Sequence, residues 1–375
     1  DVTITHVADT GIALNSKDIA GVASINKGQI GGRRNIIYNG EMKVAQRSTS
    51  VAGLGAAGGY FTLDRWKIVT GLSAGRFTMA QVADGPPGFA NCLKLTTTTA
   101  DTSIAAGEYL LLEQALEGQD LQQLKKGTAS AEQFTISFWV KGNAAAVYVV
   151  EIHDTDNTRS NTQSFAVTTS WNRIELTFAA DTTGALNDDN GQSLAMGIWL
   201  HAGATYTGGT FASNTWAGVT NANRAAVDDF TSIYDATSRT LFITGVQWEL
   251  GATATEFESR TFGDELALCQ RYYYQSADDV TGGVAQGGLW VGTNLSTSAC
   301  FGTGGSFPVT MRTTPTIVIY DNSGNSGAAH VLGIGDLASV TVGTADKHGL
   351  AQLIKVTSLT AGQRLGIMYT ASAEL

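Results

Sequence analysis

The stretch FTISFWVKG at residues 134–142 alternates between apolar and mostly polar side chains along its whole length. Its apolar positions are Phe134, Ile136, Phe138 and Val140, and Trp139 and Lys141 fall between them. Successive side chains of a strand point to opposite faces of its sheet, so this spacing predicts a strand with one buried face. The pattern therefore favours a β-sheet that covers a core on one side.

The same alternation recurs along the chain. In LAMGIWLHAG, residues 194–203, Trp199 and His201 lie opposite the aliphatic positions. Similar runs are YFTLDRWKIV, RFTMAQVA, CLKLTTTT, EYLLLEQAL, AVYVVEIHD, WNRIELTFAA and TLFITGVQWEL. About nine strands over roughly 200 residues predict a large antiparallel β-sandwich, most simply a jelly roll.

The chain divides into four parts by composition and pattern. Residues 1–34 predict an extended arm that contacts another part of the assembly, and 35–262 predict the jelly roll. A short helical and aromatic joint is expected at 263–276, where DELALCQRYY favours a helix; QDLQQLKK at 119–126 favours a second short helix. Residues 277–375 predict a smaller β-sandwich-like domain, so the expected fold class is all-β.

Charge and composition limit the partners. The formal net charge is -10 and the pI about 4.9, with no cluster of lysine and arginine, which disfavours nucleic-acid binding. Apolar runs are too short for membrane insertion. Three widely spaced cysteines, Cys92, Cys269 and Cys300, support neither a disulfide framework nor a zinc knuckle.

Two glycine-rich motifs have the wrong surroundings for catalysis or cofactor binding. GLGAAG at 53–58 matches G-x-G-x-x-G, but a strand follows it where a dinucleotide site needs a helix. GLSAG at 71–75 lies between two strand patterns, so Ser73 lacks the strand-to-helix turn of a nucleophile elbow. We expect no cofactor and no catalytic residue, although convergence of two carboxylates stays open among the strand glutamates Glu113, Glu117, Glu151, Glu175 and Glu249.

Two acidic loops carry oxygen ligands that suit calcium. HDTDN at 153–157 and NDDNG at 187–191 supply the weak candidates Asp154, Asp156, Asp188 and Asp189. Neither loop completes a known calcium motif. Solvated turns rich in Asp and Asn are the favoured interpretation, and a structural calcium ion is the alternative.

Tryptophans on the polar side of predicted strands suggest a sugar-binding surface. Flat aromatic rings stack on sugar rings, so Trp139 and Trp199 are glycan-binding candidates, together with His201 and with Trp216 in the loop TWAGVTNANR. The competing interpretation is stronger: the arm, that loop or a subunit contact would bury these rings.

Several motifs occur in a characteristic order: NG-x-M-x-V-x-QR at 39–47, LDRW at 63–66, SFW at 137–139, VQ-x-E-x-G with FE-x-R up to 260, and CQRYY at 269–273. In these pieces the chain resembles bacteriophage tail-fibre and related virion proteins over roughly residues 25–275. The shared body of that family resembles a carbohydrate-binding jelly roll. The closing FPVTMRTTPT and ASAEL are also similar to the ends of phage fibre proteins.

The resemblance implies a virion protein that binds to a glycan of the host cell surface without catalysis. It implies a tail-fibre location, contacts with other tail or capsid proteins and a homo-oligomer, with a trimer favoured. Boundary residues between domains or subunits are expected at Gln270, Arg271, Tyr272, Tyr273 and Tyr274. Three alternatives remain: a decoration or scaffold protein, a polysaccharide-degrading enzyme of the tailspike type, and a cellular carbohydrate-binding module.

Overall fold

The computed structural model describes residues 33–277, 280, 290–296, 299–302, 305–331, 335–338, 340–343, 345–350, 353–356, 360 and 362–375. Before residue 33 it describes only the backbone of four short strands: β1 (Ile4–Val7) with β2 (Gly11–Leu14), and β3 (Ser24–Ile25) with β4 (Gly28–Gln29). Of the arm expected at 1–34, side-chain contacts are described only for Arg33, which lies over the Tyr38 ring, and for Arg34, which pairs with Glu249 at 3.4 Å. Its attachment role stays a prediction.

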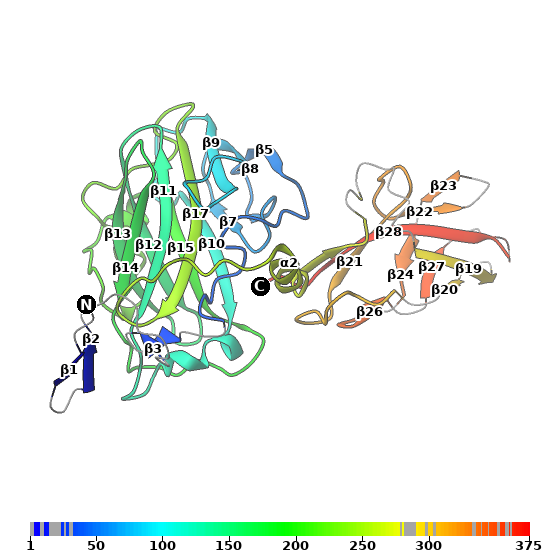
Figure 1. Ribbon diagram of the computed structural model, residues 1–375. Helices are drawn as coiled ribbons and strands as arrows, with labels where there is room; N and C mark the ends of the chain where they lie inside the picture. The colour runs from blue at the N-terminus through cyan, green and yellow to red at the C-terminus, as the bar shows by residue number, and fades with distance from the viewer. Residues whose placement is uncertain are drawn as a thin grey trace.

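Two antiparallel sheets form the main body (Figure 1). The seven-stranded sheet has the order β16 (Ala217–Gly218), β13 (Arg159–Val167), β12 (Ala146–Asp154), β15 (Gln192–Ala202), β10 (Tyr109–Glu117), β7 (Lys67–Gly71), β6 (Gly59–Tyr60). The six-stranded sheet has the order β14 (Asn172–Phe178), β11 (Phe134–Gly142), β17 (Thr240–Leu250), β9 (Cys92–Thr99), β8 (Arg76–Val82), β5 (Ser50–Leu54). The two sheets pack face to face as a β-sandwich, and the predicted all-β fold is confirmed.

The core lies between these sheets, as alternation predicts. On β11 the side chains of Phe134, Ile136, Phe138 and Val140 all belong to the buried cluster. Phe134 stacks on Phe178 of β14 with ring centres 5.2 Å apart and contacts Trp248 of β17 at 4.8 Å. Aromatic pairs of this kind add to the free energy gained by burying apolar surface.

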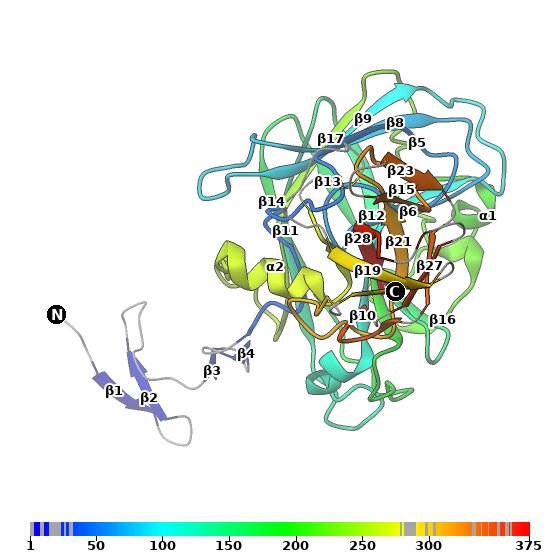
Figure 2. The same cartoon turned by 90° about the vertical axis from the view of Figure 1, so that its right-hand side faces the viewer.

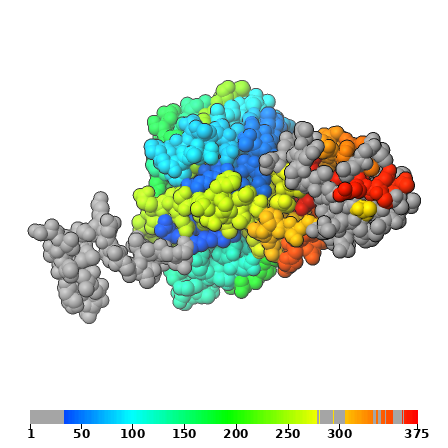
Figure 3. Space-filling model, turned by 45° about the vertical axis from the view of Figure 1, so that its right-hand side comes forward, coloured from blue at the N-terminus to red at the C-terminus, as the bar shows by residue number. Residues whose placement is uncertain are grey.

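A second β domain projects from one side of the sandwich (Figure 1, Figure 3) and lies in front of it after a turn of 90° (Figure 2). Its longest strand, β28 (Arg364–Ser372), pairs near its end with β18 (Tyr273–Gln275) and β21 (Thr316–Tyr320). Nearer its beginning β28 pairs with β19 (Trp290–Ser296) and β22 (Ala328–Val331). The remaining strands are β20 (Ala299–Gly302), β23 (Gly335–Ala338), β24 (Val340–Val342), β25 (Ala345–Asp346), β26 (Gly349–Leu350) and β27 (Leu353–Val356).

Helices are short and few among the described residues. The expected helix at 264–273 is α2 (Phe262–Gln270), which begins earlier because the Thr261 hydroxyl accepts a hydrogen bond from the backbone N–H of Asp264. The expected helix at 119–126 is instead two 3₁₀ turns, η1 (Gly118–Asp120) and η2 (Gln122–Leu124). The others are α1 (Ala204–Thr207) and η3 (Asn221–Asn223). No helix in the described part of the chain is long and apolar enough to span a bilayer.

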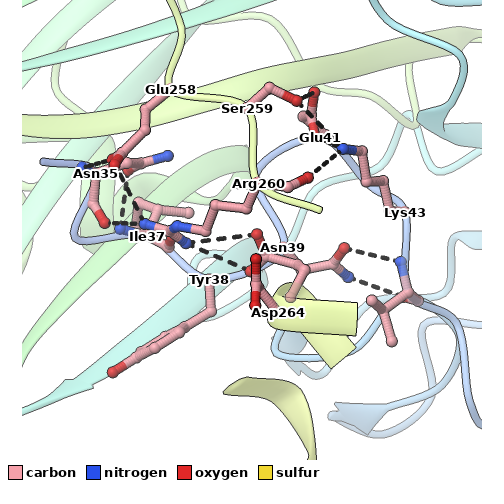
Figure 4. Close-up of polar contacts among 12 residues, drawn as sticks. Asn35, Ile37, Tyr38, Asn39, Glu41, Lys43, Glu258, Ser259, Arg260 and Asp264 are labelled. Carbon is pink, nitrogen blue, oxygen red and sulfur yellow. Dashed lines mark hydrogen bonds and ion pairs between the residues drawn. The ribbon is translucent and has the colours of Figure 1, made fainter. Parts of the chain in front are cut away.

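Hydrogen bonds and ion pairs join residues 35–44 to residues 258–265 at the edge of the sandwich (Figure 4). Arg260 donates from Nη1 to the Ile37 carbonyl at 3.0 Å, and Lys43 donates to the Arg260 carbonyl at 2.7 Å. Gly40 allows this path, because a Cβ there would lie 2.1 Å from the Val246 carbonyl oxygen. Two motifs distant in the sequence, at 39–47 and 257–260, thus build one polar contact.

Candidate functional site

Trp199 is covered by protein. Its side chain is 1% exposed, and its Nε1–H donates to Glu151 Oε2 at 2.8 Å. Arg224 lies over the indole ring at 4.9 Å and makes two-pronged hydrogen bonds to the same carboxylate. Arg224 belongs to the loop TWAGVTNANR, so the competing interpretation, burial by this loop, holds for Trp199. Prediction of a sugar platform at Trp199 is therefore wrong for this structure.

His201 is also buried, at 0% exposure. Its Nδ1 lies 2.7 Å from Ser232 Oγ and its Nε2 lies 3.2 Å from Glu108 Oε2. Burial lowers the pKa of the imidazole, and the nearby carboxylates of Glu108 and Asp101 oppose this shift. An imidazole enclosed in this way does not reach a glycan at the surface, so the expectation for His201 is corrected.

Trp216 is half-buried and points its indole N–H into the protein. Nε1 donates to the Ala179 carbonyl at 2.7 Å, and the Lys126 ammonium lies 5.2 Å from the ring centre. The ring thus covers a buried ion pair at the end of the seven-stranded sheet. Trp216 and Trp199 do not converge with Trp139, because Trp139 lies on the six-stranded sheet.

Trp139 faces outward from β11 and is half-exposed. Its neighbours across the sheet are Arg173 on β14 and Thr244 on β17. Gly245, with φ +62°, leaves room for the ring: a Cβ there would lie 3.1 Å from Trp139 and 2.7 Å from Phe89. Phe89 in turn meets Phe257 edge to face at 5.2 Å. Three half-exposed aromatic rings therefore gather beside this glycine.

A second group of rings continues along the same outer face. Trp171 and Phe242 meet edge to face at 6.3 Å, and the Lys141 ammonium lies 5.0 Å and 4.7 Å from their centres. Lys94 of β9 approaches Phe242 from the other side at 5.2 Å. Lys141 follows Trp139 by two residues on β11, so both groups lie side by side. We call this surface the aromatic strip: Phe89, Trp139, Trp171, Phe242 and Phe257.

Four members of the aromatic strip were missed by sequence reasoning. Phe242 and Lys141 alternate with core residues in their strands, which is the signal that identified Trp139. Phe89 and Phe257 lie in loops, where no periodicity exists to mark them. Only the folded chain shows that these loops return to the outer face of one sheet.

Of the aspartates considered as calcium ligands, Asp154 is bonded to a lysine. Lys126 places its ammonium 2.5 Å from Asp154 Oδ2 and 3.1 Å from Asp181 Oδ2. The same ammonium donates to the carbonyls of Thr183 and Gly184 at 3.0 Å and 2.9 Å. Four oxygens around one charge resemble the surroundings of a bound cation. The lysine side chain thus takes the position that a calcium ion would fill beside Asp154 under the alternative interpretation.

The remaining calcium candidates hold turns together. Asp156 accepts hydrogen bonds from the backbone N–H and side-chain amide of Asn187 at 2.9 Å each. Asp189 accepts from the Gly191 N–H at 2.8 Å, and Asp188 is exposed. These contacts match the favoured interpretation of solvated turns.

Glu113 and Glu151 flank Gly197 on the outer face of the seven-stranded sheet. Burial raises the pKa of Glu113, and the charge of Lys67 opposes this shift. Both oxygens of Glu151 accept hydrogen bonds from Arg224. Glu113 and Glu151 therefore lie on either side of the same strand, β15. Glu151, however, is bonded to Arg224 and holds the loop that contains it.

The expected boundary residues lie where the two domains join. Arg271 makes a two-pronged ion pair with Glu117 at 2.8 Å and 2.6 Å, and Tyr272 donates to the same carboxylate. Arg47 lies 3.6 Å from the centre of the Tyr273 ring. Tyr274 contacts Phe307 and Tyr369 of the second domain, and Gln270 lines a hollow of about 410 Å³ beside α2. A subunit boundary at these residues stays a prediction.

Of the comparisons with known proteins, only the one with solved structures gives matches. No protein-family model matches the chain, and no curated protein matches it either. Among solved structures, a family 11 carbohydrate-binding module of a Clostridium thermocellum cellulase is 15% identical, with a TM-score of 0.27, covering 54% of this chain and 99% of that one. The module TmCBM61 in complex with β-1,4-galactotriose is 9% identical, with a TM-score of 0.30, covering 58% and 99%.

A phage protein is also among the similar structures. The enzymatically active domain of tailspike protein 4 from bacteriophage CBA120 is 13% identical, with a TM-score of 0.27, covering 58% of this chain and 21% of that one. TM-scores in this range carry no argument about function. The fold stated above rests on the strand order and register of the chain itself.

Proposed function

We propose that this protein is a non-catalytic virion protein of a bacteriophage tail fibre or similar appendage, which binds a host-surface glycan through the aromatic strip. The observation that carries the binding part is the set of half-exposed rings around Trp139 on one outer face. Stacking on sugar rings uses such flat apolar surfaces, and adjacent polar side chains bind the hydroxyls.

Polar groups suited to a glycan border the aromatic strip. Lys141 pairs with Asp84 at 3.0 Å, and Arg173 pairs with Glu175 at 3.2 Å. Asp84 and Glu175 are exposed, so hydroxyl groups of a bound sugar reach them from solvent. Four neighbouring strands contribute to this face, and strands lie about 5 Å apart, so the row from Trp171 to Lys94 spans roughly 15 Å. That length suits an oligosaccharide better than a single sugar.

The virion part of the proposal is supported by the phage-like motifs, whose residues have defined structural roles. The motifs at 39–47, 63–66 and 269–273 all supply side chains to the joint between the two domains. A rigid joint suits a fibre, which must hold its receptor-binding surface at a distance from the particle. A homo-oligomer would add avidity to weak individual contacts.

A glycan array with the full chain tests the binding proposal, followed by titration of any hit. We expect Trp139→Ala to weaken the binding of that glycan at least tenfold, because one stacked ring is lost. Phe262→Ala is the matched control, since Phe262 is an exposed ring, at 58%, outside the aromatic strip. Equal loss in both variants, or no array hit with native protein, would refute glycan binding.

Two further measurements test the location and the assembly. Antibody labelling of intact particles should mark a tail appendage; labelling of the capsid surface would favour the decoration alternative. Mass measurement in solution should give a multiple of the chain mass, and a stable monomer would contradict the oligomer.

A further inference from the structure

Three buried side chains able to bind a metal lie together at one end of the sandwich. Asp101 and Glu108 belong to the connection from β9 to β10, and His201 belongs to β15. One ligand atom from each lies within 4.8 Å of the other two. The residues are 6%, 5% and 0% exposed, so the cluster is enclosed by protein.

The charge of this cluster distinguishes it from the other buried carboxylates of the sandwich. Each of those has a lysine or arginine partner: Glu41 with Lys43, Asp64 with Arg47, Glu117 with Arg271, Glu151 with Arg224, Asp154 and Asp181 with Lys126, Glu249 with Arg34, and Glu265 with Arg260. Asp101 and Glu108 form no such ion pair within the described residues. Two buried negative charges without a cation are unfavourable, so the site favours a positive ligand.

Surrounding groups orient these side chains as outer-shell partners orient metal ligands. Asp101 Oδ2 accepts from the N–H of Ala74 at 2.9 Å and of Gly75 at 3.3 Å, and from the Ser73 hydroxyl at 3.2 Å. These bonds leave the other Asp101 oxygen, Oδ1, for a ligand. These hydrogen bonds hold the Asp101 carboxylate in place through one oxygen, as outer-shell partners hold a metal ligand.

The imidazole is held in the same way. Ser232 Oγ lies 2.7 Å from His201 Nδ1, so the hydroxyl oxygen can accept the Nδ1 proton. The lone pair of Nε2 then faces Glu108 Oε2, 3.2 Å away. Neighbouring ligands of a tetrahedral metal ion are separated by about this distance when each bond is about 2.0–2.2 Å long.

We propose that Asp101, Glu108 and His201 bind one divalent transition-metal ion, with Zn²⁺ the best match to one imidazole nitrogen and two carboxylate oxygens. Calcium fits less well, because it prefers oxygen ligands throughout. The ion joins the β9–β10 connection, which crosses between the two sheets, to the end of β15. Its role is structural: it holds the two sheets together at this end of the sandwich.

Zinc binding to the full chain, stripped with a chelator, tests this assignment. We expect one tightly bound Zn²⁺ per chain by mass spectrometry and a higher midpoint of thermal unfolding when Zn²⁺ is added. Glu108→Gln should weaken zinc binding at least tenfold while leaving the metal-free fold intact, because glutamine can still hydrogen-bond His201. Visible absorption of bound Co²⁺ should be lost in the same variant.

His330→Gln is the matched control, since His330 pairs with Asp336 at 2.7 Å on the surface of the second domain. It should bind zinc as the wild type does. The proposal is overturned if the wild type binds no zinc, if Glu108→Gln binds it as tightly, or if loss of His330 removes the bound ion. Stabilisation by Ca²⁺ but not by Zn²⁺ would overturn the choice of metal.

Discussion

Arg65 of the sandwich forms a buried ion pair with Glu374, the residue that follows the last strand of the second domain by two positions. Its guanidinium also lies 3.5 Å from the centre of the Tyr272 ring and donates to the Ala115 carbonyl at 2.6 Å. Arg47 reaches the other Glu374 oxygen at 3.0 Å. Glu374 thus pairs with two arginines where the domains meet.

We expect Glu374→Gln to destabilise this joint by about 3 kcal/mol, because Arg65 would keep a buried charge without its partner. Urea unfolding followed by tryptophan fluorescence measures the change. Glu132→Gln is the control: its ion pair with Lys125 is partly exposed, and loss of such a pair costs about 0.5 kcal/mol. Equal effects of the two substitutions would show that the joint does not depend on Glu374.

Asp64 should make the protein less stable as the pH rises. Burial raises the pKa of this carboxyl to about 6, although Arg47 and hydrogen bonds from Gln46 oppose the shift. The folded state therefore binds the proton more tightly than the unfolded state does. The resulting stabilisation is complete below about pH 4 and is lost as the pH rises through about 6.

Comparison of wild type with Asp64→Asn measures this effect. Between about pH 4 and pH 7 the wild type should lose up to about 3 kcal/mol relative to the variant, whose amide does not ionise. Midpoints of urea unfolding at the two pH values give the difference. A difference between the proteins that is the same at both pH values would contradict the assignment to Asp64.

Lys126→Ala should create a calcium site. Removing the ammonium leaves Asp154 buried without a cation, while Asp181 keeps Arg159, and we expect a cost of about 3 kcal/mol in the absence of calcium. Two carboxylates and two carbonyl oxygens then remain around the vacated position. Calcium should therefore raise the thermal midpoint of the variant and leave that of the wild type unchanged. Rescue by Mg²⁺ but not Ca²⁺ would argue against this geometry.

Arg224→Met should uncover Trp199. Glu151 would lose its cation, so we expect destabilisation of about 3 kcal/mol and release of the loop over the indole ring. Fluorescence quenching by acrylamide should increase relative to wild type, because a buried tryptophan becomes accessible. Arg239→Met, which removes the ion-pair partner of Asp235, is the control and should leave quenching nearly unchanged. No increase in the Arg224 variant would show that other residues suffice to cover the ring.

The sandwich could be predicted because its inner faces repeat every second residue. Ile136 and Leu194 belong to strands that alternate clearly, and both lie in the core. The cover on the seven-stranded sheet could be predicted only as one of three possibilities: the arm, the loop TWAGVTNANR or a subunit contact. Residues 203–234 show no regular alternation of apolar and polar side chains, so nothing in their pattern shows that Arg224 reaches Trp199.

The candidate site was predictable only in part. Alternation placed Trp139 on an outer face, but the partners Phe89 and Phe257 come from loops without periodicity. The ion pair of Arg65 with Glu374 joins residues 309 positions apart, a separation at which local pattern gives no information. Motif order pointed to the right residues without showing that they meet.

The pairing of β18 with β28, Tyr273 opposite Ser372, has a mechanical consequence. The chain enters the second domain and leaves it through two hydrogen-bonded neighbours, so a bending load on that domain is shared by two covalent crossings. A single linker would act as a swivel. Two adjacent strands, held to the sandwich by Arg47 and Arg65, resist twisting of the second domain. They also transmit a force on that domain to the sandwich.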